Sequence, residues 1–215
     1  MPGPFVIDVI SDVICPWCFL GKRRLDAALA EFEDLEILVR WRPFMLDPTI
    51  PADGLDRQDY LLSKFGPERL KTLHDRIIEA ARDLAVPYNF DAITRTPNTL
   101  DAHRLIRWSH TADRQNQVAE QLFTAYWNEG RDIGQHAELA RIAGEAGLNP
   151  AQIAELLASD QDVESTRTEI AHATQIGVTG VPTFILAQRF ALQGAQTPEV
   201  IADAIQRTID ADSNE

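Results

Sequence analysis

Cys15 and Cys18 are the residues of this sequence best suited to chemistry, and the chain has no other cysteine. With two residues between them, the sulfurs can form a short disulfide or act as a reactive thiol pair. The same spacing occurs in structural disulfides and in half of a zinc site. Because the sequence has neither a second cysteine pair nor two histidines at zinc-binding spacing, zinc is the weaker interpretation and we expect no metal.

The segments around the cysteines are typical of an α/β protein. Residues 5–10 are apolar and β-branched, as in a buried strand, residues 20–33 place apolar side chains at helical spacing, and residues 36–42 resemble a second strand. Such a β-α-β unit has parallel strands, with its chemistry at the carboxyl end of the first strand. The cysteines lie at that end. Residues 43–51 contain three prolines and are predicted to form an irregular loop.

The middle of the chain is predicted to be helical, with no convincing strand between residues 56 and 177. Helices are expected over residues 67–84, 98–108, 113–129, 135–146, 150–158 and 160–175. Residues 183–186 and 190–193 then resemble a β-hairpin, and residues 198–210 a final helix. The predicted fold class is α/β, in which a β-α-β half and a β-β-α half are separated by a large helical block.

Composition limits the partners. The formal net charge of −13 argues against nucleic acid, because binding a phosphate backbone requires clustered Lys and Arg. We expect no membrane partner, because no apolar segment approaches the roughly 18 residues needed to span a bilayer. The N-terminal residues lack signal-peptide features, so we expect a cytoplasmic protein. In that reducing compartment a vicinal cysteine pair is more often catalytic, redox-sensing or metal-binding than a permanent structural disulfide. The sequence indicates no oligomeric state.

Several motifs resemble a known family. Cys15-Pro16-Trp17-Cys18 and Gly177-Val178-Thr179-Gly180-Val181-Pro182-Thr183-Phe184 resemble the DsbA-like thioredoxin-fold oxidoreductases. The FrnE-type branch of that family, which is similar to 2-hydroxychromene-2-carboxylate isomerases and kappa-class glutathione transferases, is indicated by residues 98–105, 125–133 and 194–196. The resemblance implies a thioredoxin fold interrupted by a large all-helical insertion. We therefore expect a thioredoxin-like domain over residues 1–55 and 178–215 and a helical insertion domain over residues 56–177.

The resemblance also implies which residues contact substrate: Pro16, Trp17, Val181, Pro182, Asn98 and His103. In the family, a proline at the position of Pro182 is cis and faces the redox cysteines. A cis bond there would present the Val181 backbone to an extended substrate strand. For His103, packing within a helix is the preferred interpretation and lining of a pocket the alternative. The isomerase and transferase relatives typically have serine in place of the first cysteine, so the two sulfurs of this chain favour disulfide exchange.

Position within the predicted helix distinguishes the two cysteines. Cys15 precedes the first helical turn, where unsatisfied backbone N–H groups and the helix dipole stabilise a thiolate. We therefore interpret Cys15 as the attacking nucleophile and Cys18 as the resolving thiol. The predicted function is disulfide exchange with a disulfide-containing protein or a small-molecule thiol substrate, in the reductase or isomerase direction. We expect no cofactor beyond the redox-active cysteine pair, with glutathione as a candidate co-substrate.

Two other functions stay open at this point. A glutathione-dependent isomerase or transferase would use the helical block to bind a small aromatic substrate. A redox-sensing or chaperone-like protein would bind clients tightly without catalytic exchange.

The Cys15-Cys18 pair is expected to have a reduction potential between those of thioredoxin and DsbA, about −270 to −120 mV. The physical reason is that Trp17 adds an apolar surface beside the sulfurs but no charge. Equilibration with glutathione redox buffers followed by thiol trapping measures the potential. A value outside this interval would contradict the interpretation.

Overall fold

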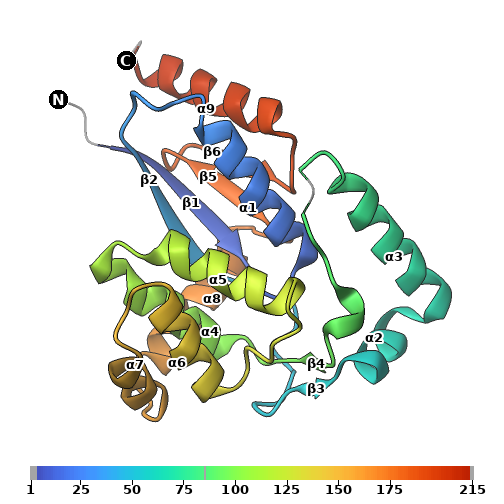
Figure 1. Cartoon of the computed structure of the whole chain (residues 1–215). Helices are drawn as coiled ribbons and strands as arrows, with labels where there is room; N and C mark the ends of the chain where they lie inside the picture. Colours follow the sequence, from blue (N-terminus) through green and yellow to red (C-terminus); the bar gives the residue numbers. More distant parts are fainter. Residues whose placement is uncertain (1–3, 85, 214–215) are drawn as a thin grey trace.

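The computed structural model describes residues 4–84 and 86–213 and has the predicted two-part α/β plan (Figure 1). The elements of the thioredoxin fold are β1 (Phe5–Ser11), α1 (Pro16–Leu29), β2 (Ile37–Pro43), β5 (Thr183–Leu186), β6 (Phe190–Gln193) and α9 (Pro198–Ser213). The predicted β-α-β and β-β-α halves are confirmed. Both strands of the predicted hairpin begin and end at the predicted residues.

The strands of these two halves form one sheet in the order β2-β1-β5-β6. Strand β1 pairs in parallel with β2 and antiparallel with β5, and β5 pairs antiparallel with β6. Because β1 has a neighbour on each side, its nearly continuous apolar character is explained by burial. The register places Ile10 opposite Thr183, so the carboxyl end of β1 lies beside the beginning of β5.

Helices cover both faces of the sheet. Helices α1 and α9 pack against each other over one face, and α8 (Val163–Gln175) packs behind it against β2 (Figure 1). Side chains of β1 alternate between the two faces. Ile10 packs with Ala173 and Val178 on the α8 side. Ile7 and Val9, by alternation, belong to the face covered by α1.

Along the chain, the remaining helices follow β2 and precede β5. They are α2 (Arg57–Phe65), α3 (Pro67–Ala80), α4 (Leu100–Trp108), α5 (Gln115–Trp127), α6 (His136–Glu145) and α7 (Pro150–Leu157). Short 3₁₀ helices η1 (Phe90–Ala92) and η2 (Ser109–Ala112) accompany them. The predicted helices are thus present, each within a few residues of its expected ends. The proposed domain boundaries at residues 55/56 and 177/178 stay a prediction.

Two local predictions for this helical block are corrected. Helix α2 is additional to the expected set, and its start is fixed by the Asp56 carboxylate, which accepts a hydrogen bond from Asp59 N at 3.0 Å. The expectation of no strand after residue 56 is wrong at β3 (Leu55–Asp56) and β4 (Arg95–Thr96), which pair antiparallel. Strands of two residues are too short to produce a periodic pattern in the sequence.

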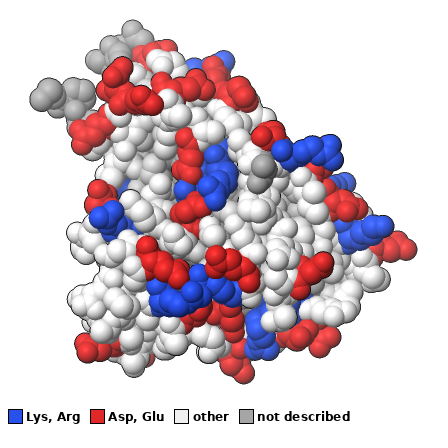
Figure 2. Space-filling model, viewed as in Figure 1, with Lys and Arg blue, Asp and Glu red and all other residues white. Residues whose placement is uncertain are grey.

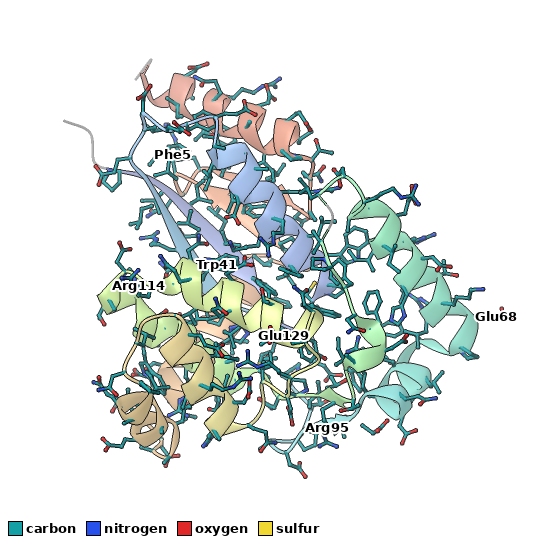
Figure 3. All side chains as sticks on the ribbon, in the orientation of Figure 1. Phe5, Trp41, Glu68, Arg95, Arg114 and Glu129 are labelled. Carbon is teal, nitrogen blue, oxygen red and sulfur yellow. The ribbon has the colours of Figure 1, made fainter. Side chains whose placement is uncertain are left out.

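One hydrophobic core extends from the sheet into the helical block, and aromatic rings make many of the contacts between the two. Phe19 of α1 stacks on Phe123 of α5 at a centroid distance of 5.4 Å, and Trp41 of β2 meets Phe123 edge-on at 6.0 Å. Figure 3 shows Trp41 lying between β2 and α5. Tyr126 and Trp127 of α5 are fully buried in this core.

Charged side chains near α1 are largely engaged in ion pairs. Lys22 lies 2.9 Å from Glu120 and also pairs with Asp26, and Arg23 pairs with Glu120. On the face drawn in Figure 2, blue and red side chains accordingly lie side by side near the centre of the molecule. The charge of Lys22 is therefore balanced locally by carboxylates. Among the described residues, no helix has the length and hydropathy required to span a membrane.

The buried Arg104 side chain links separate segments of the helical block by hydrogen bonds. Its side chain is buried and donates to the carbonyl oxygens of Gln161 and Ser159, at 2.9 and 2.7 Å, and to the Asp101 carboxylate at 2.7 Å. A buried guanidinium is stable only when its donors are satisfied in this way. The contacts tie α4 to the turn between α7 and α8.

Replacing Arg104 with Ala should lower the free energy of unfolding by about 3–5 kcal/mol, because a fully buried side chain and its hydrogen bonds to Gln161, Ser159 and Asp101 are lost. Urea denaturation followed by circular dichroism measures this as a lower midpoint with an unchanged m-value. Arg76→Ala at an exposed site of α3 is the control and should change the midpoint little. Equal midpoints for the two variants would refute the assigned role of Arg104.

Candidate active site

Cys15 is the N-cap residue of α1, and the chain turns from β1 into this helix through residues 12–15. The backbone N–H of Cys15 donates to Asp12 O at 3.0 Å, and the N–H of Cys18 donates to Cys15 O at 3.0 Å. Pro16 occupies the first helical turn, where its missing N–H costs nothing. The helix therefore begins at the cysteine pair, and the positive end of its dipole faces Cys15.

Both cysteines are buried. Both are thiols, and the exposed fraction is 4% for Cys15 and 1% for Cys18. Burial, reinforced by the neighbouring Cys15 sulfur, raises the pKa of the Cys18 thiol well above its ordinary value. The Ser11 hydroxyl and the Asp12 backbone act in the opposite direction and lower the pKa. Cys18 is therefore a neutral, buried thiol in the resting protein.

The segment Val181-Pro182, which precedes β5 in the second half of the thioredoxin fold, forms the other side of the site. The Val181-Pro182 peptide bond is cis, as the resemblance implied, and Cys15 Sγ lies 3.6 Å from Val181 O. The carbonyl of Pro182 accepts a hydrogen bond from Gly194 N at 2.8 Å, which fixes the segment to β6. Residues 166 positions apart in the chain thus form one site.

Two aromatic residues of the helical block support the cysteine loop. Trp127 Nε1 donates to Val13 O at 3.1 Å, and the Tyr88 hydroxyl donates to Pro16 O at 2.7 Å. Burial and the nearby cysteines raise the pKa of Tyr88, so its hydroxyl remains a donor at neutral pH. Neither residue is among the predicted site residues. Tyr88 belongs to no motif, and its contact depends on the tertiary fold.

Asp12 and His103 lie close to each other, and both contact the loop that follows β2. The Asp12 carboxylate is fully buried, accepts a hydrogen bond from Leu46 N at 2.8 Å, and lies 3.6 Å from His103 Nε2. His103 Nε2 contacts Phe44 O at 2.9 Å. Because a carbonyl oxygen only accepts, this ring nitrogen carries the proton. Both side chains therefore hold the loop that follows β2.

Asn98 holds the same loop at its other end. Its side-chain amide donates to Ile50 O at 2.7 Å and accepts from Leu100 N at 3.0 Å. The contacts of Asn98 and His103 are thus to backbone of residues 44–50 and to the start of α4. A direct role in substrate binding stays a prediction for both residues, and for the half-buried Pro16 and Trp17 beside the sulfurs.

A cavity of about 550 Å³ lies along the outer edge of β2, between the sheet and the helical block. Its lining includes Trp41, His103, Trp108 and Phe123, whereas neither cysteine is among the described residues that line it. Ser11 and Val13, which precede the cysteines, also line the cavity, so it reaches the segment that carries the cysteine pair. Among the residues that the structure describes, no cluster of three or more His, Cys, Asp or Glu side chains could hold a metal ion.

Comparison with known proteins places this site in a family. The family model described as a DSBA-like thioredoxin domain matches residues 6–206. The chain therefore belongs to the DsbA-like thioredoxin family of oxidoreductases. Its curated relative YwbO from Bacillus subtilis (strain 168) is 29% identical over 200 residues, which cover 93% of this chain and 94% of that protein.

Solved structures share the fold over nearly the whole chain. The probable DsbA oxidoreductase SCO1869 from Streptomyces coelicolor is 27% identical with a TM-score of 0.85, covering 94% of this chain and 89% of that chain. The cytosolic disulfide reductase DsbM from Pseudomonas aeruginosa is 18% identical with a TM-score of 0.69, covering 96% and 99%. DsbM has also been solved with GSH.

Gly21 allows α1 to approach the segment containing Pro182. A Cβ atom at Gly21 would lie 2.8 Å from Pro182 Cγ and 3.3 Å from Phe184 Cζ. We predict that Gly21→Ala lowers the free energy of unfolding by about 1–3 kcal/mol, because neither ring can move away freely. It should also slow disulfide exchange, because displacement of Pro182 moves the Val181 carbonyl from Cys15. Thermal unfolding and an insulin-reduction assay measure the two effects.

Gly144→Ala is the matched control. Gly144 also lies in a helix, but its Cβ atom would come no closer than 3.6 Å to Pro150. This variant should keep its activity and its stability, or gain slightly from the higher helix propensity of alanine. If Gly21→Ala behaves in the same way, the close approach of α1 to Pro182 does not limit the site.

Proposed function

We propose that the protein is a thiol-disulfide oxidoreductase in which Cys15 forms a mixed disulfide with the substrate and Cys18 resolves it. The observation that carries the proposal is the position of Cys15 at the start of α1, with its sulfur 3.6 Å from the Val181 carbonyl. The helix N-terminus stabilises a thiolate, and the Val181 backbone is placed to align an extended substrate beside it.

The reaction follows from the positions of the two cysteines: Cys15 caps α1 beside the Val181 carbonyl, and Cys18 lies within the first turn of the helix. The Cys15 thiolate attacks a substrate disulfide, and the first substrate sulfur leaves as a thiolate. Cys18, which is protonated in the resting protein, then loses its proton and attacks Cys15 Sγ. The second substrate sulfur departs, so the substrate is reduced and the two cysteines become a disulfide.

The substrate class and direction are further parts of this proposal. We infer that the chain reduces or isomerises disulfides of proteins or small thiols in the cytoplasm, with glutathione as a co-substrate. The common fold with DsbM, which is a cytosolic disulfide reductase solved with GSH, supports this direction. Assignment to the FrnE-type branch rests on the motifs at residues 98–105, 125–133 and 194–196.

Cysteine variants test the mechanism. Cys15→Ser should abolish insulin reduction and the reactivation of scrambled ribonuclease, because it removes the nucleophile. Cys18→Ser should also lose turnover, but should accumulate a mixed disulfide with the substrate, because no thiol remains to resolve it. Mass spectrometry of acid-quenched samples measures the adduct.

Two results would contradict the proposal. Activity retained in Cys15→Ser would exclude this nucleophile. Turnover of a small aromatic substrate that survives Cys18→Ser, together with saturable glutathione binding, would instead identify a glutathione-dependent isomerase or transferase.

A further inference from the structure

Arg24 of α1 is a buried arginine whose hydrogen bonds join this helix to two other segments of the chain. The residue is 8% exposed. Its Nη1 atom donates to Ala195 O at 2.6 Å, and its Nη2 atom donates to Ala80 O, at the end of α3, also at 2.6 Å. The Asp83 carboxylate lies 3.6 Å from Nη2. The helix that begins at the cysteine pair is therefore connected to the chain after β6 and to the carboxyl end of α3.

One branch of this network leads back to the nucleophile. Gly194, which precedes the first of the two acceptors, donates its backbone N–H to Pro182 O at 2.8 Å. The preceding residue, Val181, has its carbonyl oxygen 3.6 Å from Cys15 Sγ. Cys15 caps the same helix that carries Arg24, so this series of contacts begins and ends on α1.

Few neighbours restrain the segment that presents the Val181 carbonyl. A Cβ atom placed on Gly177 or on Gly180 would meet no atom within 4 Å beyond the adjacent residues of the chain. A backbone hydrogen bond to α8 holds the beginning of the segment, and the bond from Gly194 N to Pro182 O holds its end. The position of the segment beside the sulfur therefore depends on the attachment of its end.

The other branch of the network supports the cysteine turn. The last carbonyl groups of a helix lack partners within the helix and carry the negative end of its dipole, so a cationic donor is favoured at Ala80. The chain that follows α3 leads to Tyr88, whose hydroxyl donates to Pro16 O at 2.7 Å. The two segments that contact Cys15 and Pro16 are thus attached to one guanidinium group.

We propose that Arg24 is a positioning residue that makes the site selective for disulfides in extended polypeptides. An extended substrate forms backbone hydrogen bonds with Val181, and these bonds align its sulfur with Cys15 only if the Val181 segment is held in place. A small disulfide forms no such bonds and reacts with the Cys15 thiolate alone. The inference rests on the proposed function of the cysteine pair and adds the preferred class of substrate.

The step that tests the proposal is the attack of Cys15 on an activated disulfide. In a linear peptide whose cysteine carries thionitrobenzoate, the Cys15 thiolate forms a bond to the peptide sulfur, and the bond from that sulfur to thionitrobenzoate breaks. Thionitrobenzoate leaves with the electron pair as a coloured thiolate, because it is the better leaving group. One disulfide replaces another, so no external oxidant or reductant is needed. Ellman's reagent releases the same coloured group from a small molecule.

Stopped-flow mixing in the Cys18→Ser background isolates this attack, because no second thiol resolves the product. In Arg24→Met we expect the rate constant for the peptide to fall about tenfold to a hundredfold, the loss expected for two backbone hydrogen bonds. The rate constant for Ellman's reagent should stay within about twofold, because the nucleophile itself is unaltered. The half-saturating peptide concentration should rise while the limiting rate stays constant, since binding rather than chemistry is weakened.

Arg104→Met is the matched control, because Arg104 is also a buried arginine that donates to backbone carbonyl oxygens, but within the helical block. It should lower the stability and leave the ratio of the peptide and Ellman rate constants unchanged. Arg24→Lys provides the test if Arg24→Met does not fold. Its ammonium group keeps the charge but lacks the planar fork that reaches two carbonyl oxygens, so the ratio should fall by a smaller factor. Circular dichroism measures the folded state of each variant.

Three results would overturn the inference. An unchanged ratio of the two rate constants in both Arg24 variants would show that this residue does not position the substrate. An equal fall of both rate constants would show a general structural role. A change of the ratio in Arg104→Met as large as in Arg24→Met would show that the ratio reports only stability. Failure of the proposed function is recognised separately, because Cys15→Ser would then still release thionitrobenzoate from both reagents at the original rate.

Discussion

The contact between the start of α1 and the Val181-Pro182 segment is the constraint on which the rest of the structure depends. It requires the carboxyl end of β1 and the beginning of β5 to be neighbours, and the antiparallel register that places Ile10 opposite Thr183 achieves this. It also requires the helix to pass close to Pro182, which the absence of a side chain at Gly21 permits. Because β1 is central in the sheet, a shift of its register would separate the cysteines from this segment.

The helical block between the two halves contributes directly to the shape of the site. Trp127 and Tyr88 donate to carbonyl oxygens of Val13 and Pro16, on either side of Cys15. His103 fixes the loop after β2 at Phe44, close to the buried Asp12 carboxylate. These donors tie the cysteine loop, the start of α1 and the loop after β2 to the helical block.

Local patterns explain what the sequence predicts well. The apolar run of β1, the hairpin and the cysteine spacing are properties of short segments, and the structure has them where expected. The cis bond before β5 was implied only by family resemblance. Tyr88 was not selected, because it acquires its contact with Pro16 from a distant segment and belongs to no periodic pattern. Asn98 and His103 were selected by motif, yet their bonds are to backbone, which a motif does not specify.

The chemistry of the site depends on how a buried thiol is ionised without a neighbouring cation. Lys22 is the nearest candidate along α1, but its ammonium group is paired with Asp26 and Glu120. What remains near Cys18 are neutral donors, which stabilise a thiolate over a short range and add no charge to the core. A fixed cation would also stabilise the thiolate of the resting protein and so favour the reduced state. Without such a cation, burial dominates and the Cys18 thiol stays protonated in the resting protein.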